Sequence, residues 1–163
     1  RRLAELGATV VDPVSCGSIP LFGETELTLL LYGFKSGLNN YLTEHPKAKV
    51  RSLEDIIQFN KKNADRVMPY FQQELLEMAQ SKGDLNEPEY LEAKDECRRI
   101  SREEGIDRAL DEHNLDAIIC PTNGTPAWAN DPVVGDKIRG GCSSPAAMAG
   151  YPHVSVPAGY VHG

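Results

Sequence analysis

The chain has 163 residues, 40% of them hydrophobic and 25% charged, with a formal net charge of −7. This length is enough for one domain with a core, and no apolar run approaches the roughly 20 residues of a membrane-spanning helix. Nucleic-acid binding needs clustered Lys and Arg, so the acidic balance indicates a globular protein without nucleic-acid or membrane partners.

The four cysteines, Cys16, Cys97, Cys120 and Cys142, lie far apart in the sequence. Zinc ligands usually come in close pairs, and the four histidines also lack ligand spacing, so we expect no metal site. No glycine-rich dinucleotide or phosphate-binding motif is present, and we expect no cofactor. Cys97 and Cys120 fall on faces expected to be buried. Reduced thiols favour a cytoplasmic location, although an even number of cysteines also permits disulfides.

The N-terminal residues resemble the end of a helix followed by a strand. Leu3 and Leu6 belong to the helix, Gly7 ends it, and the β-branched run Thr9–Asp12 predicts a strand. The chain opens with Arg1 rather than Met and closes at Gly163, just after a predicted strand. We therefore expect residues 1–163 to be a single piece of a larger domain, truncated at both ends.

The strongest helix prediction covers Glu24–Leu42. Seven apolar residues recur there at helical spacing and predict a buried stripe: Leu27, Leu30, Leu31, Phe34, Leu38, Tyr41 and Leu42. Gly33 and Gly37 interrupt this helix, and each costs about 1 kcal/mol against Ala. Either another element packs closely against them, which is the commoner explanation, or the helix is locally weak.

Three further helices are predicted before residue 114. Ser52 and Asp55 resemble a capping box for a helix that starts at Leu53. A helix near Val67–Gln80 must place Pro69 in its first turn, or its boundary moves. One long charged helix is predicted over Asn86–His113, with i,i+4 ion pairs and a solvated surface.

The segment from Leu115 to Gly159 contains the remaining strands. Leu115–Cys120 is an apolar run that predicts a buried strand, and His153–Val156 predicts a second. Between them lie a long loop and a short helix, with Ser143 or Ser144 as N-cap and Gly150 as C-terminal stop. Strands separated by amphipathic helices predict an α/β fold, with a mixed sheet flanked by helices.

The run Gly140–Ser144 resembles a glycine-serine catalytic loop at first sight. A nucleophile needs a base within hydrogen-bonding reach, and no base or suitably spaced Lys lies near it in the sequence. We interpret the run as the cap of the short helix and assign it no catalytic role.

The two runs Asp116–Thr122 (DAIICPT) and Ala149–Gly159 (AGYPHVSVPAG) carry a family resemblance. Together with PTNGTPAW and SSPAAMAGYP they resemble the C-terminal part of the amidase signature family, in particular its peptide-amidase-like branch. The resemblance implies an α/β hydrolase of carboxamide bonds that uses a Lys, a bridging Ser and a nucleophilic Ser. Those three lie in an upstream stretch of the family that nothing here matches, so no catalytic residue is assigned, and Lys35 and Lys137 are not substitutes.

The loop after Leu115–Cys120 is the candidate binding segment. Open α/β sheets place ligands at the carboxyl ends of their strands, and the loop combines aromatic and polar groups typical of pocket walls. We predict substrate-binding roles for Asn123, Trp128 and Asp131, although Trp128 alternatively covers the edge of the core. The family resemblance favours the pocket, because this part of the family borders the amide-binding cleft.

These observations predict the C-terminal part of an amidase, acting on a small-molecule or peptide amide within the full-length protein. The alternative is a non-catalytic binding or structural α/β module that resembles the family. Because apolar sheet surface would remain uncovered in such a piece, self-association is a further expectation.

Overall fold

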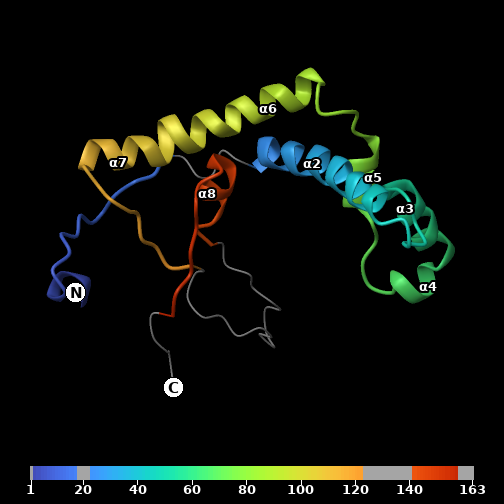
Figure 1. Cartoon of the computed structure of the whole chain (residues 1–163), viewed down its shortest axis with the longest axis horizontal. Helices are drawn as coiled ribbons and strands as arrows, with labels where there is room; N and C mark the ends of the chain where they lie inside the picture. Colours follow the sequence, from blue (N-terminus) through green and yellow to red (C-terminus); the bar gives the residue numbers. More distant parts are fainter. Residues whose placement is uncertain (1, 18–22, 123–140, 158–163) are drawn as a thin grey trace. The chain divides into compact units, whose positions relative to one another are not determined.

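The computed structural model describes residues 2–17, 23–122 and 141–157, and it divides the chain into two compact units. One comprises Arg1–Pro20 and Cys97–Gly163, here called the terminal unit. The other comprises Leu21–Glu96, here called the helical unit. Figure 1 shows the helices of both.

The helical unit is built on α2 (Gly23–Glu44), which confirms the predicted helix. It packs against α3 (Leu53–Lys62) and α5 (Glu74–Ser81), and the short α4 (Ala64–Val67) follows α3. The core consists of aliphatic and alanine side chains that face one another across these helices: Leu31, Leu53, Ile57 and Ala79, with Leu27, Leu38 and Leu76 at its border.

Only part of the predicted apolar stripe is buried. Leu31 and Leu42 are buried, whereas Leu30, Phe34 and Tyr41 are 45% exposed or more. Tyr32, which the stripe omitted, is only 1% exposed. The prediction of close packing at Gly33 and Gly37 is wrong, since a Cβ at either would have no described neighbour within 4 Å.

The burial of Tyr32 depends on groups distant in the sequence. Its hydroxyl lies 2.6 Å from Oε2 of both Glu87 and Glu89, and Lys82 Nζ lies 2.5 Å from Oε1 of Glu89. The bonds to Glu87 and then Glu89 raise the pKa of Tyr32 above its usual value. A phenol is buried here because carboxylates accept its hydrogen bond.

Local signals position the helix starts in this unit. Ser52 Oγ accepts a hydrogen bond from the Asp55 amide at 3.1 Å, and the Asp55 carboxylate accepts one from Arg51 N–H at 2.8 Å, which confirms the predicted cap. The helix predicted near Val67–Gln80 begins later, at Glu74, and Pro69 lies outside both α4 and α5. Proline has no backbone N–H to donate within a helix, so the start of this helix falls after Pro69.

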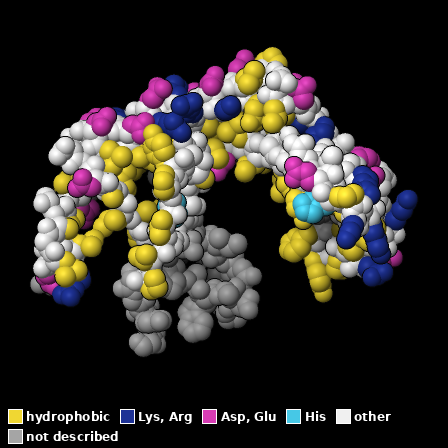
Figure 2. All heavy atoms as spheres, in the orientation of Figure 1, with side chains coloured by type: hydrophobic (Ala, Val, Ile, Leu, Met, Phe, Trp, Pro, Cys, Tyr) yellow, Lys and Arg dark blue, Asp and Glu magenta, His cyan; other side chains and the backbone are white. Residues whose placement is uncertain are grey.

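The long helical run predicted over Asn86–His113 is confirmed, with one change of type. It consists of α6 (Pro88–Arg98), the π-helix η2 (Arg99–Ile106) and α7 (Asp107–His113). The wider π-helical turn places residues five apart on one face, and Glu104 pairs there with Arg99, while Arg108 pairs with Glu112 at the i,i+4 spacing. Figure 2 shows acidic and basic side chains interspersed along this run, as expected for a solvated surface.

In the terminal unit, α8 (Ser144–Ala149) and α7 pack against η2. Their contacts bury mostly small side chains, which allow close approach of the helices: Cys97, Ala109, Ala146 and Ala149, together with Ile100. The backbone of Cys16 and Gly17 also approaches η2. A Cβ at Gly105 would lie 3.2 Å from the Cys16 carbonyl oxygen, and one at Gly17 would lie 2.5 Å from that of Glu104.

The predicted sheet is not present among the described residues. The segments Thr9–Asp12, Leu115–Cys120 and His153–Val156 are not helical, but none of them is assigned as a strand, and within the described ranges only Gly141 is a bridge residue. The predicted burial of Leu115–Cys120 is wrong: Ile119 is 68% exposed, and Cys120 is exposed as well. A strand pattern is satisfied only by partners that supply hydrogen bonds and apolar cover.

Within the ranges that the structure describes, no helix is long and apolar enough to cross a bilayer.

Candidate functional site

All three residues predicted to bind substrate, Asn123, Trp128 and Asp131, lie outside the described residues, since 123–140 is not described. The segments on either side of this range are described, and they come together in the terminal unit. The candidate site is therefore built from the chain up to Thr122 and from Gly141 onward.

The short helix α8 is positioned by η2. Gly150 ends α8 in the left-handed conformation, with φ of 69°, as predicted. Arg102 on η2 donates from Nε to the Ala149 carbonyl oxygen at 2.7 Å, which satisfies a carbonyl at the helix end. The same guanidinium lies 4.7 Å from the Tyr151 ring centroid, within range of a cation–π contact. Arg102 thereby fixes both the end of α8 and the start of the following segment.

Tyr151 makes a second attachment to the long helical run. Its hydroxyl donates to Asp107 Oδ1 at 2.7 Å, and this bond, more than burial, raises the pKa of Tyr151. At the other end of α8 the sequence interpretation needs correction. Ser143 occupies the N-cap position, but it has helical dihedral angles and its side chain makes no capping bond.

Three segments meet near the N-terminal end of α8. The Cys142 amide donates to the Thr122 carbonyl oxygen at 3.4 Å, and the Thr122 and Ser155 hydroxyls lie 3.1 Å apart. The end of the segment 115–122, the residue before α8, and the segment after it are thus adjacent.

This arrangement brings together a group of thiols and an imidazole, here called the thiol–imidazole cluster: Cys120, Cys142 and His153. Cys142 Sγ lies 3.9 Å from His153 Nε2 and 3.9 Å from the Thr122 carbonyl oxygen. The Cys120 side chain is hydrogen bonded to Cys142. Burial on its inner side, followed by this hydrogen bond, raises the pKa of Cys120 to about 11, although the residue remains exposed to solvent.

Cys16 lies close enough to add to the shift of Cys120. Its own pKa is raised by burial, and the nearby Arg108 guanidinium opposes that shift. Within the described ranges, no group of three or more His, Cys, Asp or Glu side chains has the geometry to hold a metal ion.

This cluster was not predicted from the sequence. Cys120 was expected on a buried face, and no base lies close to Cys142 in the sequence. The available signal was that Cys120, Cys142 and His153 all lie at the ends of predicted elements of one α/β unit. Ends of neighbouring elements meet in space, but the sequence does not say which of them do.

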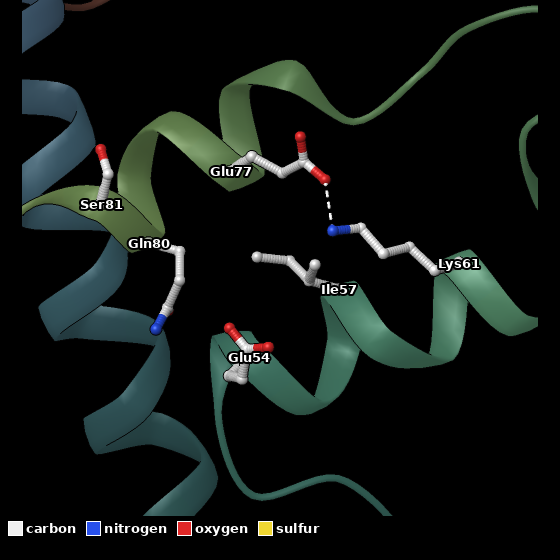
Figure 3. A pocket seen from close by; sticks show the side chains of 6 residues that line it. All are labelled: Glu54, Ile57, Lys61, Glu77, Gln80 and Ser81. Atoms are coloured by element: carbon white, nitrogen blue, oxygen red, sulfur yellow. Dashed lines mark ion pairs between the residues drawn. The ribbon is translucent and has the colours of Figure 1, made fainter.

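A shallow pocket of about 280 Å³ lies in the helical unit, where α3 and α5 pack together. Six residues line it: Glu54, Ile57, Lys61, Glu77, Gln80 and Ser81. Figure 3 shows Lys61 and Glu77 pointing toward each other above Ile57, and their charged atoms lie 2.9 Å apart. The hydrogen bond from Lys61 lowers the pKa of Glu77. Since the ammonium is engaged and the pocket is at the small end for ligand sites, it offers no activated group.

Comparison with known proteins identifies the family. A family model described as Amidase matches residues 1–163. This chain belongs to the amidase family. It is 32% identical to a probable amidase from Arabidopsis thaliana over 100% of its own length, which covers 29% of that protein.

Two solved structures of peptide amidase also resemble this chain. One is peptide amidase in complex with the competitive inhibitor chymostatin, with a TM-score of 0.85 and 41% identity over 98% of this chain and 32% of that one. The other is native peptide amidase from Stenotrophomonas maltophilia, with a TM-score of 0.79 and 42% identity over 91% of this chain and 29% of that one. The chain thus has the fold of part of a peptide-amidase-like α/β protein and spans under a third of these relatives.

Proposed function

We propose that this chain is the C-terminal part of an enzyme that hydrolyses carboxamide bonds, with the C-terminal amide of a peptide as the substrate class. The proposal rests on the 41% identity to peptide amidase over 98% of the chain, since that protein was captured with a competitive inhibitor. The amidase family model matches residues 1–163 as a whole. The proposal includes the cytoplasmic location predicted from the sequence.

The proposed role of the chain is to complete a mixed sheet and to form one wall of the substrate cleft. Exposed apolar side chains along two predicted strands support the first part, since Ile119, Val154 and Val156 are 68% to 80% exposed. Burying such side chains against neighbouring strands is favourable by about 25 cal/mol per Å². The same surfaces provide a physical reason for self-association of the chain alone.

The second part assigns the cleft wall to Asn123, Trp128 and Asp131. The meeting of Thr122, Cys142 and Ser155 supports it, because the two ends of the candidate loop are held close together. Amide and carboxylate groups beside an aromatic ring are suited to hydrogen bonding a substrate amide.

The nucleophile and base of amide hydrolysis are proposed to lie in sequence beyond this chain. Lys35 Nζ donates to the carbonyl oxygens of Gln80, at 3.0 Å, and of Lys82, which favours a structural role for this lysine. Amide hydrolysis needs nucleophile, base and oxyanion donors held together, and loss of such groups removes orders of magnitude in rate. We therefore expect the 163-residue chain alone to be inactive.

The test compares the chain with a longer protein that contains it, using a peptide amide and simple primary amides as substrates. Ammonia release is expected from the longer protein only. Ser143→Ala and Ser144→Ala in the longer protein should leave kcat unchanged. Turnover by the chain alone that disappears in either variant would instead identify Gly140–Ser144 as a catalytic loop.

A second arm of the test addresses the cleft wall. Trp128→Ala and Asn123→Ala in the longer protein should raise KM for the peptide amide, while Asp111→Asn on the exposed end of α7 serves as the matched control. If neither substitution changes KM or kcat, the cleft assignment fails, whereas inactivity of the longer protein toward every amide would favour a non-catalytic binding module.

A further inference from the structure

Cys120 and Cys142 are 22 positions apart in the sequence, yet the two thiols lie close enough to interact. The backbone brings the two residues together without help from the thiols. The Cys142 amide donates to the carbonyl oxygen of Thr122, which is two residues after Cys120. The Cys142 sulfur also approaches the same Thr122 carbonyl oxygen at 3.9 Å. The two cysteines are thus held together by the segments that carry them.

The two thiols differ in their surroundings. Cys142 is half-buried, and its sulfur lies 3.9 Å from His153 Nε2. Cys120 is exposed, and at neutral pH it keeps its proton, because burial on its inner side and the bond to Cys142 raise its pKa to about 11. A thiol beside an imidazole is the pattern of reactive cysteines, so Cys142 is the one to react first.

We propose that Cys120 and Cys142 form a dithiol site that hydrogen peroxide oxidises to a disulfide, with His153 as the base for Cys142. In the first step the Cys142 proton passes to His153 Nε2. The sulfur attacks one peroxide oxygen, the O–O bond breaks, and the leaving hydroxide takes the proton from His153 to form water.

In the second step Cys120 Sγ attacks the sulfenic sulfur of Cys142. The S–S bond forms, the S–O bond breaks, and the hydroxyl leaves as a second water molecule with the proton of Cys120. Two thiols and one peroxide thus give one disulfide and two waters. The reaction reduces the peroxide by two electrons, which the two sulfurs supply.

The disulfide would join the segment 115–122 to the residue that precedes α8. In the reduced chain, the Cys142 amide joins these segments through its 3.4 Å hydrogen bond to the Thr122 carbonyl oxygen, and the Cys142 sulfur lies 3.9 Å from the same oxygen. Oxidation would replace it with a covalent link, while α8 stays attached to Arg102 through Ala149.

The sequence provides a direct assay. Trypsin cleaves after Arg and Lys, so each cysteine lies on its own peptide: Cys16 on 3–35, Cys97 on 95–98, Cys120 on 109–137 and Cys142 on 140–163. The full chain is treated with hydrogen peroxide, blocked with iodoacetamide, digested without reductant and analysed by mass spectrometry. The expected product is peptide 109–137 joined to 140–163, and it should disappear on reduction.

Variants separate the steps. In Cys120→Ser the linked pair should be absent, and dimedone should label Cys142 as sulfenic acid. His153→Gln should slow formation of the linked pair several-fold, whereas Cys16→Ser, which removes the nearby third thiol, should leave both the rate and the product unchanged.

The proposal is overturned if Cys142 oxidises to sulfinic acid without a linked peptide, or if Cys16 is the cysteine found joined to either partner. Equal rates in the chain and in His153→Gln would overturn the role of the imidazole. None of these measurements uses amide hydrolysis, so they are independent of the proposed function.

Discussion

The two units of this chain differ in how their apolar residues are covered. The helical unit buries large side chains such as Leu31, Leu53 and Ile57 between its own helices. The terminal unit buries mainly small side chains against η2, and leaves the aliphatic residues of its extended segments exposed. Amphipathic helices can bury one another's apolar faces within a short stretch of chain, here Leu21–Glu96. Strands instead depend on hydrogen-bonding partners that are remote in the sequence. Four predictions test this difference.

The largest effect is expected in the core of the helical unit. Leu53 is fully buried, so Leu53→Ala should lower the free energy of unfolding by about 2–5 kcal/mol, the range for deletion of a packed leucine side chain. Urea unfolding followed by circular dichroism measures the change. Leu75→Ala is the matched control, since Leu75 is 61% exposed and should cost far less. Similar losses in the two variants would contradict the assigned core.

The next effect concerns the close backbone contact in the terminal unit. Gly17 has φ of 82°, and a Cβ there would lie 2.5 Å from the Glu104 carbonyl oxygen. Gly17→Ala should therefore cost about 1–3 kcal/mol through backbone strain, increased by the clash. Gly7→Ala separates the two causes, because Gly7 has φ of 96° but no described atom within 4 Å of the added Cβ. Equal losses in urea unfolding would show that the contact with η2 contributes nothing.

A smaller effect of opposite sign is expected in α2. Gly33 and Gly37 have open space where a Cβ would be placed, so Gly33→Ala should stabilise the helical unit by about 1 kcal/mol through helix propensity. Gly105→Ala is the contrasting variant. It lies in the helical run, but its Cβ would lie 2.7 Å from the Ile100 carbonyl oxygen, so it should destabilise. A higher melting temperature in both variants would contradict the close packing described around Gly105 in η2.

The smallest effect is a pH dependence in the helical unit. The pKa of Glu77 is lowered by its hydrogen bond from Lys61, and that of Glu89 by Lys82 and then Tyr32. A carboxyl with a lowered pKa contributes stability that is fully present above its unfolded value of 4.5 and is lost as the pH falls below it. Exposed ion pairs contribute little, so we expect a modest drop in melting temperature below pH 4.5.

The control for this prediction removes one of the carboxyls. Glu77→Gln should melt lower than the parent chain at pH 7 and lose less on acidification, whereas Glu92→Gln removes a carboxyl from the exposed surface of α6. An identical acid response in the parent chain and Glu77→Gln would exclude the Lys61 pair as a contributor.

Much of the helical structure could be predicted from local patterns. The apolar period predicted α2, the Ser52–Asp55 pair predicted the start of α3, and Gly150 predicted the end of α8. Each signal acts within one or two turns of backbone, so neighbouring residues determine it. The family was recognised for a similar reason, because its motifs are short ordered blocks in the sequence.

Other features depended on which segments meet. Periodicity placed Phe34 and Tyr41 in the core and omitted Tyr32, since the burial of a phenol depends on Glu87 and Glu89, more than 50 positions away. The wide turn of η2 exists where Gly105 admits the backbone of Cys16, a contact between distant residues. The pairing of Cys142 with Cys120 and His153 likewise required the folded chain.

The sequence by itself determined most of the helical segments, the N-cap of α3, the end of α8 and the family, because these depend on residues within a few positions of one another. Only the tertiary structure decided which apolar residues are covered, where the helix widens and which thiols meet. Those outcomes depend on contacts between residues that are remote in the chain, and no local pattern specifies such a contact.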